Sequence, residues 1–279
     1  MKRIIFVLLH SHGHFMLSRN FRLQRVGDIN WLLRNYEIRR VSQGIDELII
    51  LDVSAPESNR DLFYSDVARV VEECFIPVAV GGNLRTLQDI DECFAAGSDK
   101  IVLNRAFFEF PALCIDAATK YGSQAVIAGI DVADESFSTQ LKINRHAVAR
   151  DSLAEHVRAV SALGAGELLI QSIARDGTGS GVDLSLVQSS ASGSTPLILM
   201  GGVGQPEHIS QALLHEGVDA VATANLFNFI GSTLVEARDL AIAAGVPLGR
   251  ASAIDLEDMR GILGSMRLNQ GHGPSARSM

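Results

Sequence analysis

One stretch of this chain recurs about 120 residues further along, and this duplication constrains the fold more than any other feature. Residues 44–50 (GIDELII) match residues 164–170 (GAGELLI) at an offset of 120, and residues 96–107 have a match at the same offset. Residues 77–82 have a match at an offset of 119. Solenoid repeats recur at much shorter periods of about 20–50 residues. The long period therefore indicates that one half of a domain has been duplicated.

Eight short apolar runs, separated by helix-like stretches, predict eight βα units. Each run is rich in Val, Ile or Leu with little polar alternation, which is typical of strands buried on both faces of a parallel sheet. The runs cover residues 3–9, 47–52, 77–81, 100–103, 125–131, 167–172, 196–200 and 220–223. Eight such units close into a barrel. We expect an α/β fold over residues 1–250, a (βα)8 TIM barrel built from two repeated half-barrels.

Two segments fall outside the barrel pattern. Residues 137–150 (FSTQLKINRHAVAR) alternate apolar and polar side chains, which predicts a hairpin after the fifth strand. Residues 251–279 form a short C-terminal extension. We expect a short helix over residues 256–263, followed by a Gly-, Ser- and Asn-rich tail of a composition typical of disorder.

The composition excludes several classes of protein. The 279 residues include 24 basic and 32 acidic side chains, a formal net charge of −8, which argues against a nucleic-acid or membrane surface. No apolar run approaches the roughly 18 residues of a membrane span, and the first run ends at Leu9 without a cleavage site. The three cysteines lack metal-ligand spacing. We expect a soluble cytoplasmic protein that uses no metal or other cofactor.

In such barrels the chemistry lies where the strands end at the C-terminal face. Two Gly-Gly pairs related by the repeat follow the third and seventh strands, and glycine lets backbone N–H groups approach an anion. A turn that only admits helix packing is the alternative for either pair alone. The two copies together predict two phosphate sites, and hence a ligand with a phosphate at each end. The residues assigned to them are Gly81, Gly82, Asn83, Asn104, Arg105, Gly201, Gly202, Ala224 and Asn225.

Three aspartates end neighbouring strands at the same face. Asp131 and Asp52 close their strands directly, and Asp176 lies in a glycine-rich loop, residues 174–181 (ARDGTGSG). Carboxylates directed into a barrel mouth are candidates for general acid–base catalysis. Hydrogen bonding to loop backbone is the alternative, and it is favoured more for Asp52 than for Asp131.

Two further groups of polar residues mark the ends of the strands. His10, His12 and His14 alternate after the first strand and could share a metal, but a mobile, solvated loop is the favoured interpretation because no carboxylate or cysteine is spaced to complete the ligand set. At the opposite face, each of four charged residues begins a strand. On physical grounds alone, two cations and two anions there predict a salt-bridge cluster that plugs the barrel floor: Arg3, Glu47, Lys100 and Glu167.

Taken together, these segments resemble the cyclase subunit of imidazole glycerol phosphate synthase over about residues 2–248. The matching pieces are KRII, DELIILD, EECFIPVAVGG, DKIVLNRA, YGSQAVIAGID, LGAGELLIQSIARDGTGSGVDL and GVDAVATANLFNF. The resemblance implies a glutaminase partner docked at the N-terminal face and ammonia that passes along the barrel axis through a charged gate. At the far mouth the ammonia attacks a small substrate with two phosphates, and aspartates on the first and fifth strands act as acid–base catalysts.

The resemblance assigns catalytic roles unevenly. Asp131 matches the fifth-strand catalytic aspartate, and Asp176 matches a further active-site aspartate. Leu9 occupies the position of the first-strand aspartate, and leucine can neither accept nor donate a proton. Leu17 stands where a lysine is usual in the first loop, and Ala174 replaces a residue that is commonly aspartate.

The substrate-binding positions are also partly altered. Asn83 and Arg105 replace the glycine and the serine or threonine that are usual at the first phosphate site, and Gln171 replaces a threonine. Asp52 and Gly177 complete the substrate contacts that we assign. The substrate end of the barrel has therefore changed at several places.

The floor matches the family throughout. Its four charged residues fill every position of the ammonia gate, which favours a gate over a plug, and Asp99 matches a residue that helps to dock the glutaminase. A retained gate below an altered mouth resembles a paralogous branch of the family, which works with a separate amidotransferase to amidinate surface-polysaccharide sugars. The Leu8-Leu9 pair and residues 25–28 (RVGD) also suit that branch.

Two alternatives remain open. The chain could be a working histidine-pathway synthase subunit in which Asp131 and Asp176 suffice for cyclisation. It could also be a non-catalytic scaffold that keeps two phosphate sites for sensing. The related sugar isomerase with the same half-barrel repeat is a poorer match, because it has no reason to keep the charged floor.

Overall fold

The structure is a computed structural model, and it describes residues 1–35, 41, 43–55, 59–134, 146–224 and 233–249. The C-terminal extension expected over residues 251–279, with its helix over residues 256–263, lies outside the described residues. Most of the hairpin predicted over residues 137–150 does so too. The part of that segment that is described contains the two-residue strand β8 (Val148–Ala149), which pairs in parallel with the preceding barrel strand.

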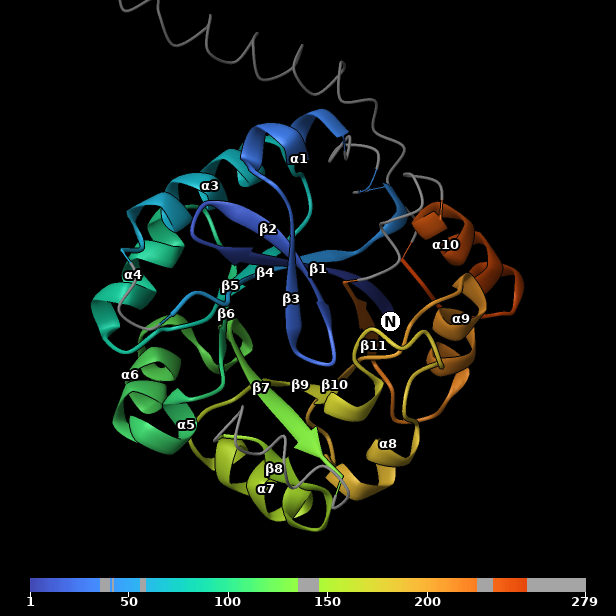
Figure 1. Ribbon diagram of the computed structural model, residues 1–279. Coiled ribbons are helices and arrows are strands. Elements are labelled where there is room, and N and C mark those ends of the chain that lie inside the picture. Colours follow the sequence, from blue (N-terminus) through green and yellow to red (C-terminus); the bar gives the residue numbers. More distant parts are fainter. Residues whose placement is uncertain (36–40, 42, 56–58, 135–145, 225–232, 250–279) are drawn as a thin grey trace, which may run out of the picture. The chain divides into compact units, whose positions relative to one another are not determined.

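Eight parallel strands close into a barrel, and this confirms the predicted fold (Figure 1). Along one edge the first barrel strand pairs with the second barrel strand. Along its other edge it pairs with the last barrel strand, where Arg3 lies opposite Ala220, and this pairing closes the cylinder. The barrel strands are β1 (Arg3–Ser11), β4 (Glu47–Asp52), β5 (Val78–Gly81), β6 (Lys100–Leu103), β7 (Val126–Ala133), β9 (Glu167–Ser172), β10 (Leu197–Met200) and β11 (Ala220–Thr223).

The strand register preserves the duplication seen in the sequence. In the first half Ala79 of β5 lies opposite Lys100 of β6, and in the second half Ile198 of β10 lies opposite Ala220 of β11. Equivalent positions are therefore 119 residues apart on β5 and β10 and 120 apart on β6 and β11. This register allows any residue of one half to be compared with its counterpart in the other.

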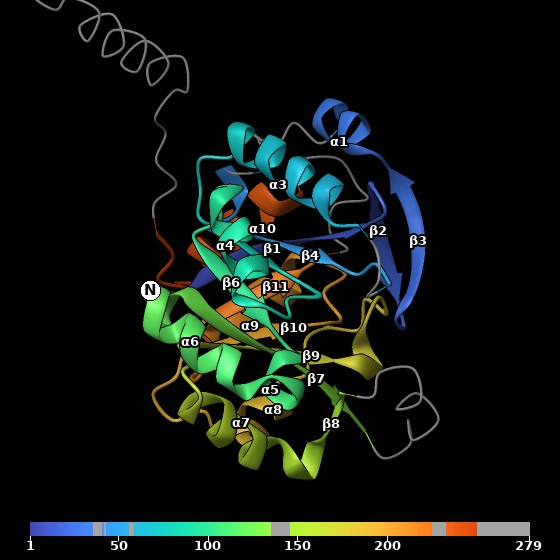
Figure 2. The same ribbon diagram turned by 90° about the vertical axis from the view of Figure 1, so that its left-hand side faces the viewer.

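Helices surround the barrel and cover its outer face (Figures 1 and 2). They are α1 (Ile29–Asn35), α3 (Asp61–Glu73), α4 (Leu87–Ala95), α5 (Ala106–Glu109), α6 (Pro111–Tyr121), α7 (Leu153–Ala162), α8 (Ser185–Ser190), α9 (Pro206–Leu214) and α10 (Thr233–Ala243). Short 3-10 turns lie at η1 (Ser123–Ala125), η4 (Arg150–Ser152) and η5 (Ile173–Arg175). Among the helices that are described, none is long and apolar enough to cross a membrane.

The barrel strands bury both faces, as their uniformly apolar sequences predicted. On β1 the side chains of Ile4, Phe6 and Leu8 point outward and pack in the layer between sheet and helices. Those of Val7 and Leu9 point inward, into a separate apolar cluster that lines the barrel interior together with residues such as Ile5, Ile49, Ala79, Val102, Ile127, Leu169, Ile198 and Met200. Because strand side chains alternate, residue 9 has to lie inside the barrel.

The sequence did not predict the antiparallel hairpin that follows β1. It consists of β2 (His14–Arg19) and β3 (Arg22–Gly27), and it folds across the C-terminal mouth of the barrel (Figure 1). We call these residues, 14–27, the lid. Figure 2 shows the lid at the end of the barrel toward which β1 and β4 run. The expectation of a solvated loop after the first strand is therefore wrong.

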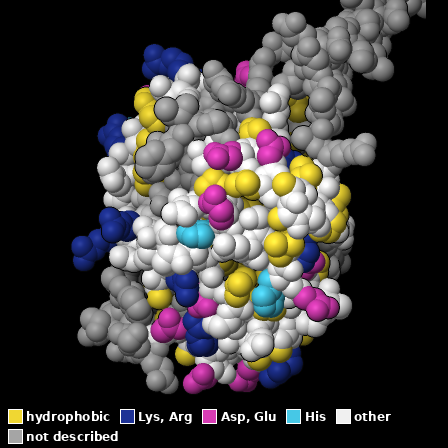
Figure 3. All heavy atoms as spheres, turned by 90° about the vertical axis from the view of Figure 1, so that its right-hand side faces the viewer, with side chains coloured by type: hydrophobic (Ala, Val, Ile, Leu, Met, Phe, Trp, Pro, Cys, Tyr) yellow, Lys and Arg dark blue, Asp and Glu magenta, His cyan; other side chains and the backbone are white. Residues whose placement is uncertain are grey.

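The outer surface of the lid is basic. Arg19, Arg22 and Arg25 are exposed, and Arg19 lies directly opposite Arg22 in the β2–β3 ladder. Figure 3 views the molecule with the mouth face at its left-hand edge, where dark-blue basic side chains project. Because the whole chain has a net charge of −8 and residues 14–27 contain no Asp or Glu, the lid differs in sign from the molecule as a whole.

Candidate functional site

A cavity of about 400 Å³ opens at the C-terminal ends of the strands, beneath the lid. The predicted site residues that line it are Asp52, Gly82, Asn83, Asn104, Arg105, Asp131, Gln171, Asp176 and Ala224. A smaller pocket of about 20 Å³ adjoins it and is lined by Gly177, Gly201 and Gly202. Asp176 and Ala224 line both spaces, so the two Gly-Gly turns flank one continuous site. Asn225 lies outside the described residues.

Asp131 and Leu9 both face this cavity from the barrel interior. Asn104 Nδ2 donates a hydrogen bond to Asp131 Oδ2 at 2.8 Å, which orients the carboxylate. Leu9 is only 7% exposed and packs within the interior apolar cluster, next to Met16 and Leu51. The mouth thus presents one oriented carboxylate on β7 and a hydrocarbon side chain on β1.

Asp176 lines the cavity, but its carboxylate is bonded to the lid. Oδ2 accepts a hydrogen bond from Ser18 Oγ at 2.6 Å and another from the Phe21 N–H at 2.9 Å. The Asn20 N–H donates to the Asp176 carbonyl at 3.1 Å. Asp176 is buried, and such charge-assisted bonds are stronger than neutral ones. In this structure Asp176 therefore acts to hold the lid over the mouth.

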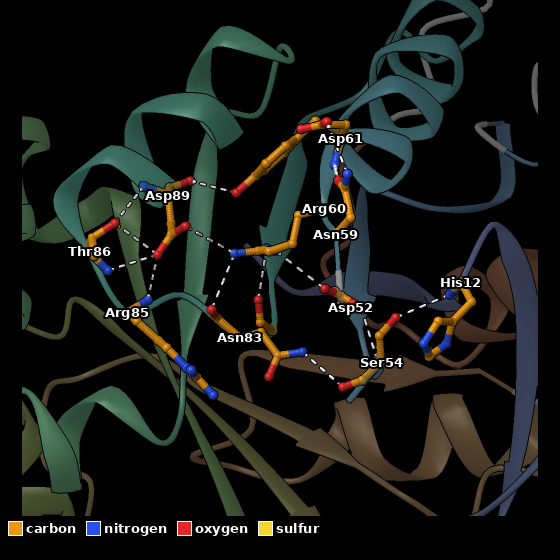
Figure 4. A network of polar contacts seen from close by, with 12 residues as sticks. His12, Asp52, Ser54, Asn59, Arg60, Asp61, Asn83, Arg85, Thr86 and Asp89 are labelled. Atoms are coloured by element: carbon orange, nitrogen blue, oxygen red, sulfur yellow. Dashed lines mark hydrogen bonds and ion pairs between the residues drawn. The ribbon is translucent and has the colours of Figure 1, made fainter. Parts of the chain in front are cut away.

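The first Gly-Gly turn is held by an arginine that the sequence analysis missed (Figure 4). Arg60 donates to the carbonyl oxygens of Gly82 at 2.9 Å and Asn83 at 3.2 Å, and its Nε lies 3.4 Å from Asp52 Oδ2. A trans peptide directs its N–H opposite to its C=O. The N–H groups of Asn83 and Leu84 therefore point away from Arg60, on the side where these residues line the cavity.

Glycine is required in this turn for steric reasons. Gly82 has φ +91°, and a Cβ there would lie 2.0 Å from the Asp52 carbonyl oxygen. A Cβ on Gly81 would lie 2.5 Å from the Val102 carbonyl oxygen. The Asp52 carboxylate also accepts the Ser54 N–H at 3.0 Å. Asp52 thus makes the loop contacts that we gave as its alternative role, although it also borders the cavity.

The second turn repeats the positive φ angles of Gly82 (+91°) and Asn83 (+53°), with different support. Gly201 and Gly202 have φ +100° and +93°, and the Gly202 carbonyl accepts the Gly181 N–H at 2.7 Å. A Cβ on Gly202 would lie 2.1 Å from the Gly181 carbonyl oxygen. The smaller pocket is lined by backbone and small or apolar side chains, with Asp176 as its charged residue. Both turns can present N–H groups to an anion, the geometry that the prediction of two phosphate sites requires.

At the opposite end of the barrel, the four charged residues converge on one another. We call Arg3, Glu47, Lys100 and Glu167 the charged ring. Arg3 contacts Glu47 at 2.9 Å and Glu167 at 3.1 Å. Lys100 contacts the same two carboxylates at 3.0 and 2.9 Å. Cations and anions therefore alternate, and each side chain contacts two of opposite sign.

Burial shapes the electrostatics of the ring. The Glu47 side chain is 2% exposed, and this burial raises its pKa, although Lys100 and Arg3 oppose the shift. Burial alone would lower the pKa of Arg3, but the carboxylates of Glu167 and Glu47 outweigh it and raise this pKa above its ordinary value. The side chains of Arg3 and Lys100 are each 18% exposed, so the ring retains some contact with solvent.

Comparison with known proteins agrees with this geometry. The family described as "Histidine biosynthesis protein" matches residues 22–232, which include the barrel strands from β4 to β11 but not β1 or β2. The chain belongs to this family. It is also 39% identical over 242 residues to a protein of Parasynechococcus marenigrum (strain WH8102) named "Putative imidazole glycerol phosphate synthase subunit hisF2". The match covers 86% of this chain and 90% of that relative.

The histidine run of this member of the histidine biosynthesis protein family is divided between core and surface. His10 is 1% exposed, its Nε2 lies 3.0 Å from Asp66 Oδ2, and its ring packs against Phe15 and Phe63. His12 is exposed. Within the described part of the chain, no group of three His, Cys, Asp or Glu side chains is placed to hold a metal ion.

Asp99, the predicted docking residue of this family member, has a structural contact of its own. Its Oδ2 accepts the Val78 N–H at 2.9 Å, and its repeat counterpart Asp219 accepts the Leu197 N–H at the same distance. Asp99 is also exposed at the N-terminal face. The docking role therefore stays a prediction beside a structural role that both halves share.

Several residues that shape the site were not predicted. Ser18 and Phe21 belong to the lid, and Asn20, a residue type common in tight turns, is the signal that could have revealed a hairpin there. No local pattern indicated Arg60, because its partners are Asp52 at the end of β4, Asn83 after β5 and Asp89 at the start of α4. Arg85, which also lines the cavity, follows the first turn by three residues.

Proposed function

We propose that this chain is the ammonia-accepting, cyclase-type subunit of an imidazole glycerol phosphate synthase-like complex in which cyclisation is lost or weakened. The observation that carries the proposal is the combination of Leu9 and Asp131 facing the same cavity at the mouth with a complete charged ring at the floor. The name of the relative in Parasynechococcus marenigrum supports assignment to such a complex.

The proposed route for ammonia begins at the charged ring and ends at the mouth. In the arrangement observed, the four side chains are in mutual contact and close the floor. A glutaminase subunit docked at this face would displace one cation, and Lys100 is the candidate because a flexible single chain carries its charge. Beyond the ring, the interior is lined by apolar residues such as Val7, Ile127 and Leu169, which make no hydrogen bond that would retain a neutral molecule.

At the mouth, only Asp131 of the two expected acid–base positions carries a carboxylate. Asp131 can exchange a proton with a ligand in the cavity, but Leu9 supplies no partner on the opposite strand. Losing one acid–base group typically slows a reaction by about 10²–10⁴-fold. Weak cyclisation is therefore expected, while delivery of ammonia to the mouth needs no carboxylate at position 9.

The acceptor of the ammonia follows from the branch that the sequence resembles. In this proposal a separate sugar amidotransferase takes up the nitrogen in the cytoplasm during surface-polysaccharide synthesis. Leu9 is the structural support for this step, because a chain that has lost its own cyclisation base requires another enzyme to use the nitrogen.

Glutamine hydrolysis tests the partnership. The chain is purified with its co-expressed glutaminase, and glutamine turnover is measured with and without it. We expect hydrolysis to depend on the chain and to respond to Lys100→Met, with Lys120→Met, on the surface of α6, as a matched control. Absence of any stimulation, together with tight bisphosphate binding, would favour the scaffold alternative.

Direct cyclisation tests the chemistry. The chain is supplied with ammonium salt and the histidine-pathway nucleotide, and product formation is compared for wild type, Leu9→Asp and Leu9→Asn. We expect low turnover in wild type, a gain of about 10²-fold or more in Leu9→Asp, and none in the isosteric Leu9→Asn. Wild-type turnover equal to that of an aspartate-bearing enzyme would support the working-synthase alternative and end the proposal of lost cyclisation.

A further inference from the structure

One end of the large cavity carries two arginines that the other end lacks. Arg85 and Arg105 line the cavity beside the first Gly-Gly turn. At the offset of 119 defined by the strand register, Arg85 corresponds to Gly204, and at the offset of 120 Arg105 corresponds to Asn225. No Lys or Arg is among the described residues that line the smaller pocket. The two halves of the barrel thus differ in charge at equivalent anion-binding turns.

Arg85 has a fixed backbone and a guanidinium that is available for a ligand. The Arg85 N–H donates to Asp89 Oδ2 at 2.9 Å, at the start of α4. Figure 4 shows the guanidinium extending away from Asp89 and from the network around Arg60. Its Nε is buried without a hydrogen-bond partner among the described residues. A buried donor left unsatisfied is costly, which indicates a position completed by a bound anion.

Arg105 is similarly available. Its contact with Glu109, four residues along, spans 3.8 Å from Nε to Oε2, which is too long for a hydrogen bond. Glu109 Oε1 is in addition 3.0 Å from His146 Nε2, so this carboxylate is shared. Arg105 follows β6 and Arg85 follows β5, and these strands are adjacent in the barrel.

Two of the neighbouring carboxylates are already paired with a different arginine. Arg60 is already paired with Asp52 at 3.4 Å and lies 3.7 Å from Asp89, so those two carboxylates are compensated. Asp131 lines the same cavity, and its carboxylate accepts a hydrogen bond from Asn104. The end of the cavity beside the first Gly-Gly turn therefore combines the N–H groups of Asn83 and Leu84 with two guanidinium groups.

We infer that this end of the cavity binds a diphosphate group, whereas the Gly201-Gly202 end takes a phosphate monoester. Each guanidinium can bind a phosphoryl group through two parallel hydrogen bonds. Two adjacent arginines therefore match two linked phosphoryl groups better than one. The inference rests on the proposed function of the mouth as a substrate site, and it names the substrate class as one with a diphosphate at the β5–β6 end.

Anion titration tests this assignment. Binding of pyrophosphate and of orthophosphate to the full chain is measured by calorimetry at 0.15 M ionic strength, where distant charges are largely screened. The variants are Arg85→Ser and Arg105→Ser, and Arg22→Ser on the exposed face of the lid is the control for loss of one positive charge. We expect pyrophosphate to bind about tenfold or more tightly than orthophosphate, with a stoichiometry of one.

The two arginine variants are expected to lose about tenfold or more in pyrophosphate affinity, in line with a charge-assisted hydrogen bond. Arg22→Ser is expected to change it by less than about twofold. Equal affinity for the two anions, or an equal loss in all three variants, would overturn the inference. Glutaminase stimulation by the wild-type chain is measured separately. If stimulation persists without a pyrophosphate preference, the diphosphate inference alone has failed.

Discussion

The charged ring predicts a strong and specific coupling between Glu47 and Lys100. Glu47→Gln removes one anion from a ring of two cations and two anions and leaves an uncompensated positive charge. Glu47 is 2% exposed and contacts both Arg3 and Lys100. Breaking a buried ion pair costs about 3–5 kcal/mol. Because Arg3 and Lys100 are each 18% exposed, we expect the low end, about 3 kcal/mol.

The double variant restores neutrality. With Glu47→Gln and Lys100→Met together, Arg3 and Glu167 remain paired at 3.1 Å and no charge is left unpaired in the ring. We expect a total cost of about 3 kcal/mol instead of the sum of about 6 kcal/mol, hence a coupling energy of about 3 kcal/mol. At about 2–4 °C per kcal/mol, each single variant should lower Tm by about 6–12 °C.

Urea unfolding of the two single variants and the double variant gives the coupling energy directly. The matched control is the surface pair of Lys120 and Asp91, whose side chains are 46% and 43% exposed. Lys120→Met and Asp91→Asn are expected to have additive effects. If the ring variants are additive to within about 0.5 kcal/mol, the ring contributes no more than an exposed pair. The reasoning about buried ion pairs in the ring is then refuted.

Three further perturbations follow from the site. Asp176→Asn should loosen the lid and speed tryptic cleavage after Arg19 and Arg22 by about tenfold, because the charge-assisted bonds to Ser18 and Phe21 are weakened. Gln24→Ala, at an exposed position on β3, is the control. Unchanged cleavage in Asp176→Asn would argue against a role in holding the lid. Gly82→Ala should lower the free energy of unfolding by at least about 3 kcal/mol, because the new Cβ would lie 2.0 Å from the Asp52 carbonyl oxygen. Gly193 also has a positive φ, +62°, but open space around it, so Gly193→Ala should cost about 1 kcal/mol. Equal losses in the two variants would contradict the steric argument. Burial alone would raise the pKa of Asp183, but hydrogen bonds from Ser185 and Arg150 outweigh it and hold this pKa below its ordinary value. The carboxylate therefore stabilises the fold above pH about 4, and the contribution is lost as the pH falls through the lowered pKa. Asp183→Asn should reduce stability at pH 7 and flatten the acid limb of the plot of stability against pH, and an unchanged acid limb would count against this.

Much of the architecture could be predicted from local sequence because the repeat and the apolar runs each carry the same signal. The charged ring was predictable for a related reason, since Arg3, Glu47, Lys100 and Glu167 all stand at strand starts. Closure of the barrel then has to bring these four side chains together. The prediction of two anion-binding turns rested likewise on strand ends, and the structure places both turns around one site.

The remaining features depend on contacts that no local pattern encodes. The catalytic role of Asp176 stays a prediction, but no local pattern indicated that its carboxylate is bonded to Ser18 and Phe21, which are more than 150 residues away along the chain. His10 was expected in a solvated loop, but it is buried because Asp66 on α3 provides a partner. Such pairings arise only when the tertiary fold brings distant segments together.

The lid has a kinetic consequence for any molecule bound at the mouth. Its hydrogen bonds to the described residues of the loop after β9 converge on Asp176, so lifting the hairpin is a single local event. A ligand that enters or leaves beneath the lid requires that event. Residence times should therefore follow the opening rate of residues 14–27, and ligands of very different affinity should leave at similar speeds when opening is slow.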